Sequence, residues 1–142
     1  MQRRIEVVAD QAGLIELLQF NDEAELLLRL SEEQRYVMRL AIEEIATNII
    51  KYAYPAAQPG PLCVECAADA GALRVTIADR GMPFDPRAAP APDLSTDITQ
   101  RAVGGLGLYL VRELADDLSY QHDPASGWNV LTIMKRAEGN HA

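Results

Sequence analysis

A helix with both ends marked in the sequence occupies residues 31–53, and it is the feature that most limits the possible folds. Ser31 begins a capping box, in which the serine oxygen and the Gln34 side chain satisfy backbone groups at the helix start. Pro55 disfavours helical backbone in the residue before it, so the helix ends by Tyr54. Between these limits apolar residues recur with helical spacing, at Met38, Ala41, Ile42, Ile45, Ile49 and Ala53.

Two polar residues, Glu44 and Asn48, flank the apolar side of this helix. With Ile45 at the middle of the apolar arc, a rotation of about 100° per residue puts Asn48 about 60° and Glu44 about 100° to one side. Glu43 points nearly straight to solvent. A carboxylate and a carboxamide four residues apart can point together into a cleft and share a ligand or metal. The pair alone leaves an alternative open: an ordinary surface glutamate and a hydrogen-bonded asparagine at a helix edge.

The rest of the chain gives the order strand, two helices, two strands, a long loop, a helix and two strands, which predicts an α+β two-layer sandwich. Asp10 is the expected cap of the first helix, which runs up to Leu30 with a possible break at Asn21 and Asp22. The helix after the loop follows an apolar pattern from Gly107 to Leu118. The expected strands are 4–9, 62–68 and 73–78, the last two as a hairpin, and then 119–122 and 129–134.

Composition limits the class of protein. The 142 residues are expected to form a single domain, 1–142, with the 49% hydrophobic and 24% charged content of a soluble globular protein. The chain shows no apolar run of membrane-spanning length and no secretory signal, so a cytoplasmic location without membrane attachment is expected. A net charge of −8 argues against direct nucleic-acid binding. A nucleotide ligand would need a metal cation and backbone donors to offset this charge.

The two cysteines, Cys63 and Cys66, have the spacing of a redox motif or zinc knuckle. They lie within a predicted strand, where residues three apart point to opposite faces. The sequence supplies no second cysteine pair to complete a metal site. We therefore expect two free thiols.

Two further clusters interrupt the scaffold. Asp79 closes an apolar strand and begins Asp-Arg-Gly-Met-Pro-Phe-Asp-Pro, in which Gly81 would let a ligand approach the backbone; a simple turn is the alternative. Residues 104–108, Gly-Gly-Leu-Gly-Leu, open a helix and offer unhindered N–H groups to an anion; a flexible turn is the alternative. The segment between them, rich in Pro, Ala and Asp, has the length of a lid or binding loop.

Together the three clusters resemble the GHKL ATPases, and among them the anti-sigma factor serine kinases of bacterial partner switching (RsbW-like and SpoIIAB-like). The N-box of that family is similar to residues 44–48, the first glycine box to 79–86 and the second to 105–108. The resemblance covers nearly the whole chain. It implies the GHKL (Bergerat) fold: a mixed, mostly antiparallel sheet with about three helices on one face and an ATP lid at about 85–104.

The resemblance also implies roles for individual residues, with ATP and Mg²⁺ as cofactors. Glu44 would be the catalytic base, Asn48 the Mg²⁺ ligand and Asp79 the partner of the adenine amino group. The remaining ATP-binding residues would be Tyr52, Gly81, Phe84, Arg101, Gly104, Gly105, Leu106, Gly107, Leu108 and Thr132. Two positions depart from the family pattern: Tyr52 stands where sporulation-type relatives have His, and Pro83-Phe84-Asp85-Pro86 replaces a glycine-richer sequence. The first departure puts catalytic competence in question, and the second would stiffen the start of the lid.

The function implied is an ATP-dependent serine/threonine protein kinase that phosphorylates a small STAS-like anti-sigma-factor antagonist. A homodimer and sequestration of a sigma factor or another regulated protein are further expectations. Two alternatives stay open. One is a nucleotide-gated module that sequesters a partner without kinase activity. The other is a detached histidine-kinase catalytic domain, which would need a phosphoacceptor histidine in a partner.

Overall fold

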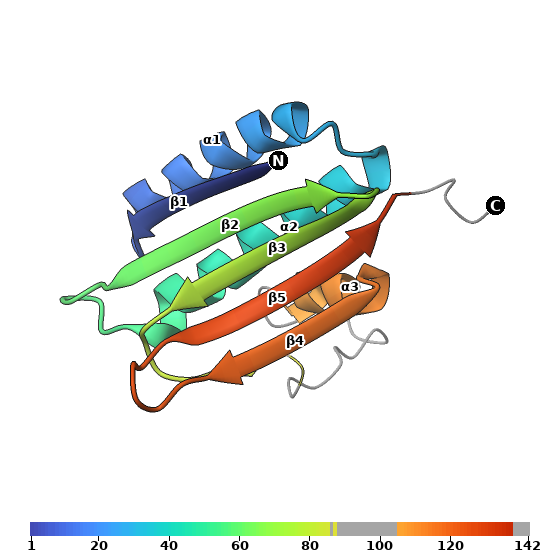
Figure 1. Ribbon diagram of the computed structural model, residues 1–142. Helices are drawn as coiled ribbons and strands as arrows, with labels where there is room; N and C mark the ends of the chain where they lie inside the picture. The colour runs from blue at the N-terminus through green and yellow to red at the C-terminus, as the bar shows by residue number, and fades with distance from the viewer. Residues whose placement is uncertain (86, 88–104, 138–142) are drawn as a thin grey trace.

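A five-stranded sheet supports three helices on one of its faces (Figure 1). The computed structural model describes residues 1–85, 87 and 105–137. The strand order across the sheet is β1-β2-β3-β5-β4, and every neighbouring pair is antiparallel. The strands are β1 (Gln2–Val8), β2 (Pro61–Asp69), β3 (Ala72–Asp79), β4 (Asp117–His122) and β5 (Asn129–Arg136). The helices are α1 (Gln11–Leu27), α2 (Glu32–Asn48) with its π-helical extension η1 (Ile49–Ala53), and α3 (Gly105–Leu114).

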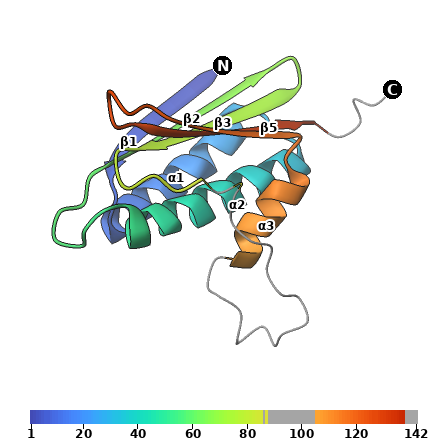
Figure 2. The ribbon, with the colours of Figure 1, turned by 90° about the horizontal axis from the view of Figure 1, so that it is seen from below.

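The core lies between the helices and the sheet, and Figure 2 shows the helices together on one side of the strands. Side chains alternate along each strand, so one set faces the helices and the other faces away. The facing set includes Val64, Val75 and Ile133, which pack with Val37 and Ile42 of α2 at 0–1% exposure. The predicted two-layer α+β class is confirmed. The sheet is antiparallel throughout the described strands, whereas the family resemblance implied a mixed, mostly antiparallel one.

Helix α1 begins where the sequence predicted, with the Asp10 carboxylate accepting the Gly13 N–H at 2.8 Å. The predicted break at Asn21 and Asp22 is wrong, because the helix continues to Leu27. Asn21 is fully buried, and Phe20 and Ala24 are buried beside it on the side of α1 that faces the core. Burial of this side stabilises the helix despite the low helix propensity of Asn and Asp.

Helix α2 has the predicted capping box, with Ser31 Oγ accepting the Gln34 N–H and Gln34 Oε1 accepting the Ser31 N–H. The Gln34 amide also donates to the carbonyls of Gly71 and Lys135, at 3.1 and 2.9 Å, which joins the helix start to the sheet. At its other end the helix widens into the π-turn of η1. A π-turn inside or after an α-helix often marks a functional site.

Helix α3 is shorter than predicted, because it ends at Leu114 and Leu118 belongs to β4. Lys135, on the helix-facing side of β5, holds this end of the helix. Its ammonium donates to the Leu114 carbonyl at 2.8 Å and pairs with Glu33 of α2 at the same distance. A nearly buried cation thus ties the last turn of α3 to the first turn of α2 and to the sheet.

The β2–β3 hairpin was predicted, and its turn has positive φ at Ala70 and Gly71. Cys63 and Cys66 are free thiols, as expected. Burial raises the pKa of the Cys66 thiol to about 12, so it is unreactive at neutral pH. In the described part of the chain, no helix is long and apolar enough to cross a membrane.

Candidate functional site

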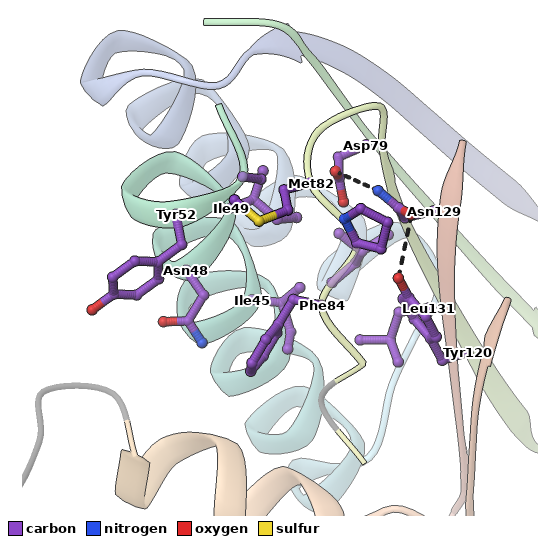
Figure 3. Close-up of a pocket in the computed structure, with 13 residues that line it drawn as sticks. Ile45, Asn48, Ile49, Tyr52, Asp79, Met82, Phe84, Tyr120, Asn129 and Leu131 are labelled. Atoms are coloured by element: carbon purple, nitrogen blue, oxygen red, sulfur yellow. Dashed lines mark hydrogen bonds between the residues drawn. The ribbon is translucent and has the colours of Figure 1, made fainter. Parts of the chain in front are cut away.

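A pocket of about 150 Å³ lies between the end of α2 and strands β3, β5 and β4 (Figure 3). Its walls are mostly apolar, including Ile45, Ile77 and Leu131. Polar groups enter from two sides, with Asn48 on the helix and Asp79 and Asn129 on the strands. An apolar pocket on which a few polar groups converge is typical of a small-molecule site.

The helix side of the pocket presents Asn48 and Tyr52, both of which line it as predicted. Asn48 is half-buried and is the last residue of α2, where the backbone changes from α to π. Tyr52 is 64% exposed at the rim. The carbonyl of Ala53, at the end of η1, accepts the Met82 N–H at 2.8 Å. The widened helix end therefore holds the loop that follows β3.

Glu44 lies one turn before Asn48 and contacts the start of α3. A side-chain carbon added to Gly107 would overlap the Glu44 side chain, so Glu44 occupies the space that a side chain at residue 107 would fill. The structure thus brings the predicted N-box and the second glycine box into contact, although Glu44 does not line the pocket itself. Burial raises the pKa of Glu44, as does the charge of Glu43, while Lys51 acts against both. A carboxylate with a raised pKa is better suited to accept a proton near neutral pH.

Asp79 ends β3 at the floor of the pocket and is only 8% exposed. Its Oδ1 atom accepts the Gly81 N–H at 2.8 Å and the Asn129 amide at 3.0 Å. Burial raises the pKa of Asp79, and these two hydrogen bonds work against that rise. A carbon added to Gly81 would overlap the Ala53 backbone, so this glycine is required by the close approach of loop and helix.

Tyr54 braces the backbone next to Asp79. Its hydroxyl accepts the Arg80 N–H and donates to the Pro61 carbonyl, both at 2.6 Å. The guanidinium of Arg80 in turn stacks on Trp128, 5.7 Å from the ring centre, and donates to the Ser126 carbonyl. The ends of β2 and β3 and the β4–β5 hairpin are thereby held together around the pocket floor.

Asn129 is a polar residue of the pocket that the sequence interpretation missed. It is 3% exposed and bonds to Asp79. The sequence could have indicated it, because strand alternation puts Asn129 on the same helix-facing side of β5 as Leu131 and Ile133. The same alternation puts Thr132 on the opposite face of the sheet, paired with Thr76. The predicted adenine contact of Thr132 is therefore wrong.

The other predicted residues fall into three groups. Phe84 lines the pocket and is 55% exposed, and Gly81 adjoins it through Asp79. Gly105, Leu106 and Gly107 open α3 as expected, but the Leu108 side chain is buried in the core, so only its backbone could meet a ligand. Arg101 and Gly104, and all of the predicted lid except Asp85 and Arg87, lie outside the described residues.

The family model described as the histidine kinase-like ATPase domain matches residues 7–135. The chain belongs to this family. The match includes the helix with Glu44 and Asn48, the end of β3 with Asp79, and the glycine-rich start of α3. The predicted GHKL membership is confirmed, and the pocket is that of an ATPase domain.

Two relatives are named as protein kinases. The chain is 31% identical over 105 residues to the serine/threonine-protein kinase BtrW of Bordetella bronchiseptica, covering 74% of this chain and 72% of that protein. It is 34% identical over 98 residues to the serine-protein kinase RsbW of Bacillus thuringiensis, covering 66% of this chain but only 59% of that protein. The crystal structure of the RsbU and RsbW domains of Rv1364c from Mycobacterium tuberculosis has the same fold, with a TM-score of 0.67, 16% identity, and coverage of 96% of this chain and 32% of that one.

The donor set of the ATPase pocket fits Mg²⁺ held mainly by a nucleotide. No cluster of three or more metal-binding side chains occurs among residues 1–85, 87 and 105–137. Mg²⁺ usually takes one or two protein oxygens and fills its other positions with phosphates and water. The half-buried Asn48 carboxamide offers one such oxygen at the pocket wall.

Proposed function

We propose that this ATPase domain is a serine/threonine protein kinase that binds ATP in the pocket and phosphorylates a small STAS-like anti-sigma-factor antagonist. The contact between Glu44 and the start of α3 carries the proposal. It sets a carboxylate beside backbone N–H groups that suit phosphate, one turn from Asn48. The named activities of BtrW and RsbW support the kinase over a module that only sequesters a partner.

The pocket orients the nucleotide by its two polar ends. Asp79, at the strand end, accepts the exocyclic amine of adenine, while Ile45, Ile77 and Leu131 supply apolar walls for the base. The phosphates then extend toward the N-terminus of α3, whose free N–H groups and helix dipole favour anions. Mg²⁺, held by Asn48 and the phosphates, would neutralise charge on the transferred group.

Glu44 acts on the protein substrate. The hydroxyl of a serine or threonine approaches the terminal phosphate next to Gly107. Glu44 accepts the hydroxyl proton as the oxygen attacks the γ-phosphorus, and the bond to the bridging oxygen breaks so that ADP leaves. Phosphoryl transfer depends mainly on alignment and charge neutralisation, so the contact between α2 and α3 has to be kept in register. The partner-binding surface, sequestration of a sigma factor or another regulated protein, and a homodimer are part of the same proposal.

The test is phosphotransfer by the Glu44→Gln variant, with Glu23→Gln as the matched control. Glu23 is exposed on α1 and does not line the pocket, so its loss leaves the pocket unchanged. The substrate is the antagonist recovered by pull-down with and without Mg·ATP, with its phosphosite mapped by mass spectrometry. We expect Glu44→Gln to bind ATP normally and to transfer phosphate about 10²–10⁴ times more slowly, while Glu23→Gln matches the wild type.

Two results would contradict the proposal in different ways. Wild-type rates in Glu44→Gln would remove Glu44 from the role of base. ATP binding by the wild-type chain without transfer to any co-purifying protein would favour the sequestering module instead.

A further inference from the structure

Asn129 is a buried amide with partners on both of its ends. Its nitrogen lies 3.0 Å from Asp79 Oδ1 and 3.0 Å from the Gly81 carbonyl. Its oxygen lies 2.6 Å from His122 Nδ1 and 3.3 Å from the Tyr120 hydroxyl. At 3% exposure the side chain has little access to water. Its hydrogen bonds are therefore made within the protein, and Figure 3 shows two of them.

The partners fix the direction of every bond in this group. An ionised carboxylate and a backbone carbonyl only accept hydrogen bonds, so the Asn129 nitrogen must face Asp79 and Gly81. The Asn129 oxygen only accepts, so Tyr120 donates to it and the bonded histidine nitrogen carries its hydrogen. The two donors come from the edge strand β4, and they hold the Asn129 amide in a single orientation.

This orientation determines what Asp79 offers to a ligand. Asp79 lines the pocket, and the hydrogen bonds that it accepts from Gly81 and Asn129 both end on Oδ1, so Oδ2 is available as an acceptor for a ligand. Burial raises the pKa of Asp79, and the hydrogen bond from Asn129 is the largest influence that lowers it. Without that bond the carboxyl would rotate more freely and would hold its proton more readily.

We propose that Asn129 is a positioning and specificity-determining residue. It holds the Asp79 carboxylate in one orientation and in its ionised form, so that the pocket selects purines with a 6-amino group. The inference rests on the proposed ATP binding and adds a residue to it. A 6-amino group donates to the free carboxylate oxygen, whereas a 6-oxo group presents a second acceptor and is repelled. A purine without a 6-substituent does neither.

A purely structural role for Asn129 predicts a different change in nucleotide affinity. If the amide only joins β3 to β5, its loss weakens binding of all purine nucleotides by the same factor. If it acts through Asp79, its loss mainly weakens binding of the 6-amino purine. The ratio of affinities for two nucleotides separates the two roles, because a general loss of stability cancels in that ratio.

The experiment measures dissociation constants by calorimetry for ATP, inosine triphosphate and purine ribonucleoside triphosphate, with Mg²⁺ present. We expect the wild-type chain to prefer ATP over the unsubstituted purine by about 10- to 100-fold, the range for a hydrogen bond to a charged group. In Asn129→Leu, which keeps the shape of the side chain and removes its hydrogen bonds, we expect the preference to fall below about threefold.

Two further variants guard against misfolding and unrelated effects. Asn129→Asp is nearly isosteric but replaces a donor by an acceptor 3.0 Å from Asp79, so the pair must share a proton and the preference for ATP is again lost. Thr132→Val, on the same strand and the opposite face, should keep both the affinity and the preference of the wild type.

Each outcome decides between the roles. An unchanged preference in both Asn129 variants, with all affinities reduced together, would overturn the proposal and leave Asn129 a structural tie. A wild-type chain that binds the three nucleotides equally would overturn the specificity role while ATP binding stands. A wild-type chain that binds none of them would overturn the proposed function as well.

Discussion

Replacing Gly107 by alanine is expected to slow phosphotransfer without weakening the fold. The added methyl group would overlap Cγ, the carboxylate carbon and one oxygen of Glu44. These atoms all belong to one flexible side chain, so Glu44 can take another χ1 rotamer while the backbones of α2 and α3 stay in place. The substitution therefore removes the carboxylate from the start of α3 and retains every backbone N–H there.

The substitution is expected to raise the stability of the fold and to lower the rate of phosphotransfer. Alanine is favoured over glycine within a helix by up to about 1 kcal/mol, which would raise the melting temperature of a chain of this size by about 2–4 °C. Loss of a positioned general base slows transfer by about 10²–10⁴, equivalent to about 3–5 kcal/mol in the activation free energy.

The assay compares single-turnover phosphotransfer and thermal unfolding for Gly107→Ala, Glu44→Gln and the double variant. If Gly107→Ala acts through Glu44, adding it to Glu44→Gln should cost little further activity. An equal loss in both backgrounds would show that the methyl group disturbs the nucleotide instead. A fall of several degrees in the melting temperature would show that the backbone, and not Glu44, gives way.

Two further predictions concern Asp79 and Tyr54. Burial raises the pKa of Asp79 in the folded state above its ordinary value of 3.8, so the folded state keeps this proton to a higher pH than the unfolded state. The folded state therefore loses stability as the pH rises from the unfolded-state pKa to the folded-state pKa. In calorimetry without nucleotide at pH 7, Asp79→Asn should therefore have a higher melting temperature than the wild type. The difference in melting temperature should shrink as the pH falls toward 3.8, and a constant difference would contradict the titration of Asp79 as its cause. Tyr54→Phe leaves the Arg80 N–H and the Pro61 carbonyl without their partner, and should lower the free energy of unfolding in urea by about 1–3 kcal/mol. A change under about 0.5 kcal/mol would mean that water replaces the hydroxyl.

The parts of the fold that the sequence predicted correctly are those decided by short-range interactions. The Ser31 capping box, the Asp10 cap and the β2–β3 hairpin depend on residues within a few positions of one another. The errors arose where distant contacts decide the outcome. Asn21 stays helical because it belongs to the side of α1 that is buried in the core, and α3 stops at Leu114 because the following residues pair with β5.

The candidate site was likewise predicted correctly where local sequence patterns decide it, and missed where distant contacts do. Residues recognisable by type and spacing, such as Asn48 and Asp79, do lie around the pocket. Asn129 was missed and Thr132 was chosen instead, although strand alternation from Ile133 would have put Asn129 on the inner face. The contact between Glu44 and Gly107 joins residues 63 positions apart, and no local pattern could reveal its closeness.

Lys135 fixes the last turn of α3 by holding the Leu114 carbonyl and Glu33 together, while Leu108 and Val111 are buried in the core nearer the start of the helix. The ten residues of α3 span about 15 Å. A tilt of about 4° about the last turn would move the glycine end by about 1 Å, a displacement large enough to change a reaction rate by about 100-fold. In the proposed mechanism, the alignment of Glu44 with its substrate therefore depends in part on a lysine that does not line the pocket.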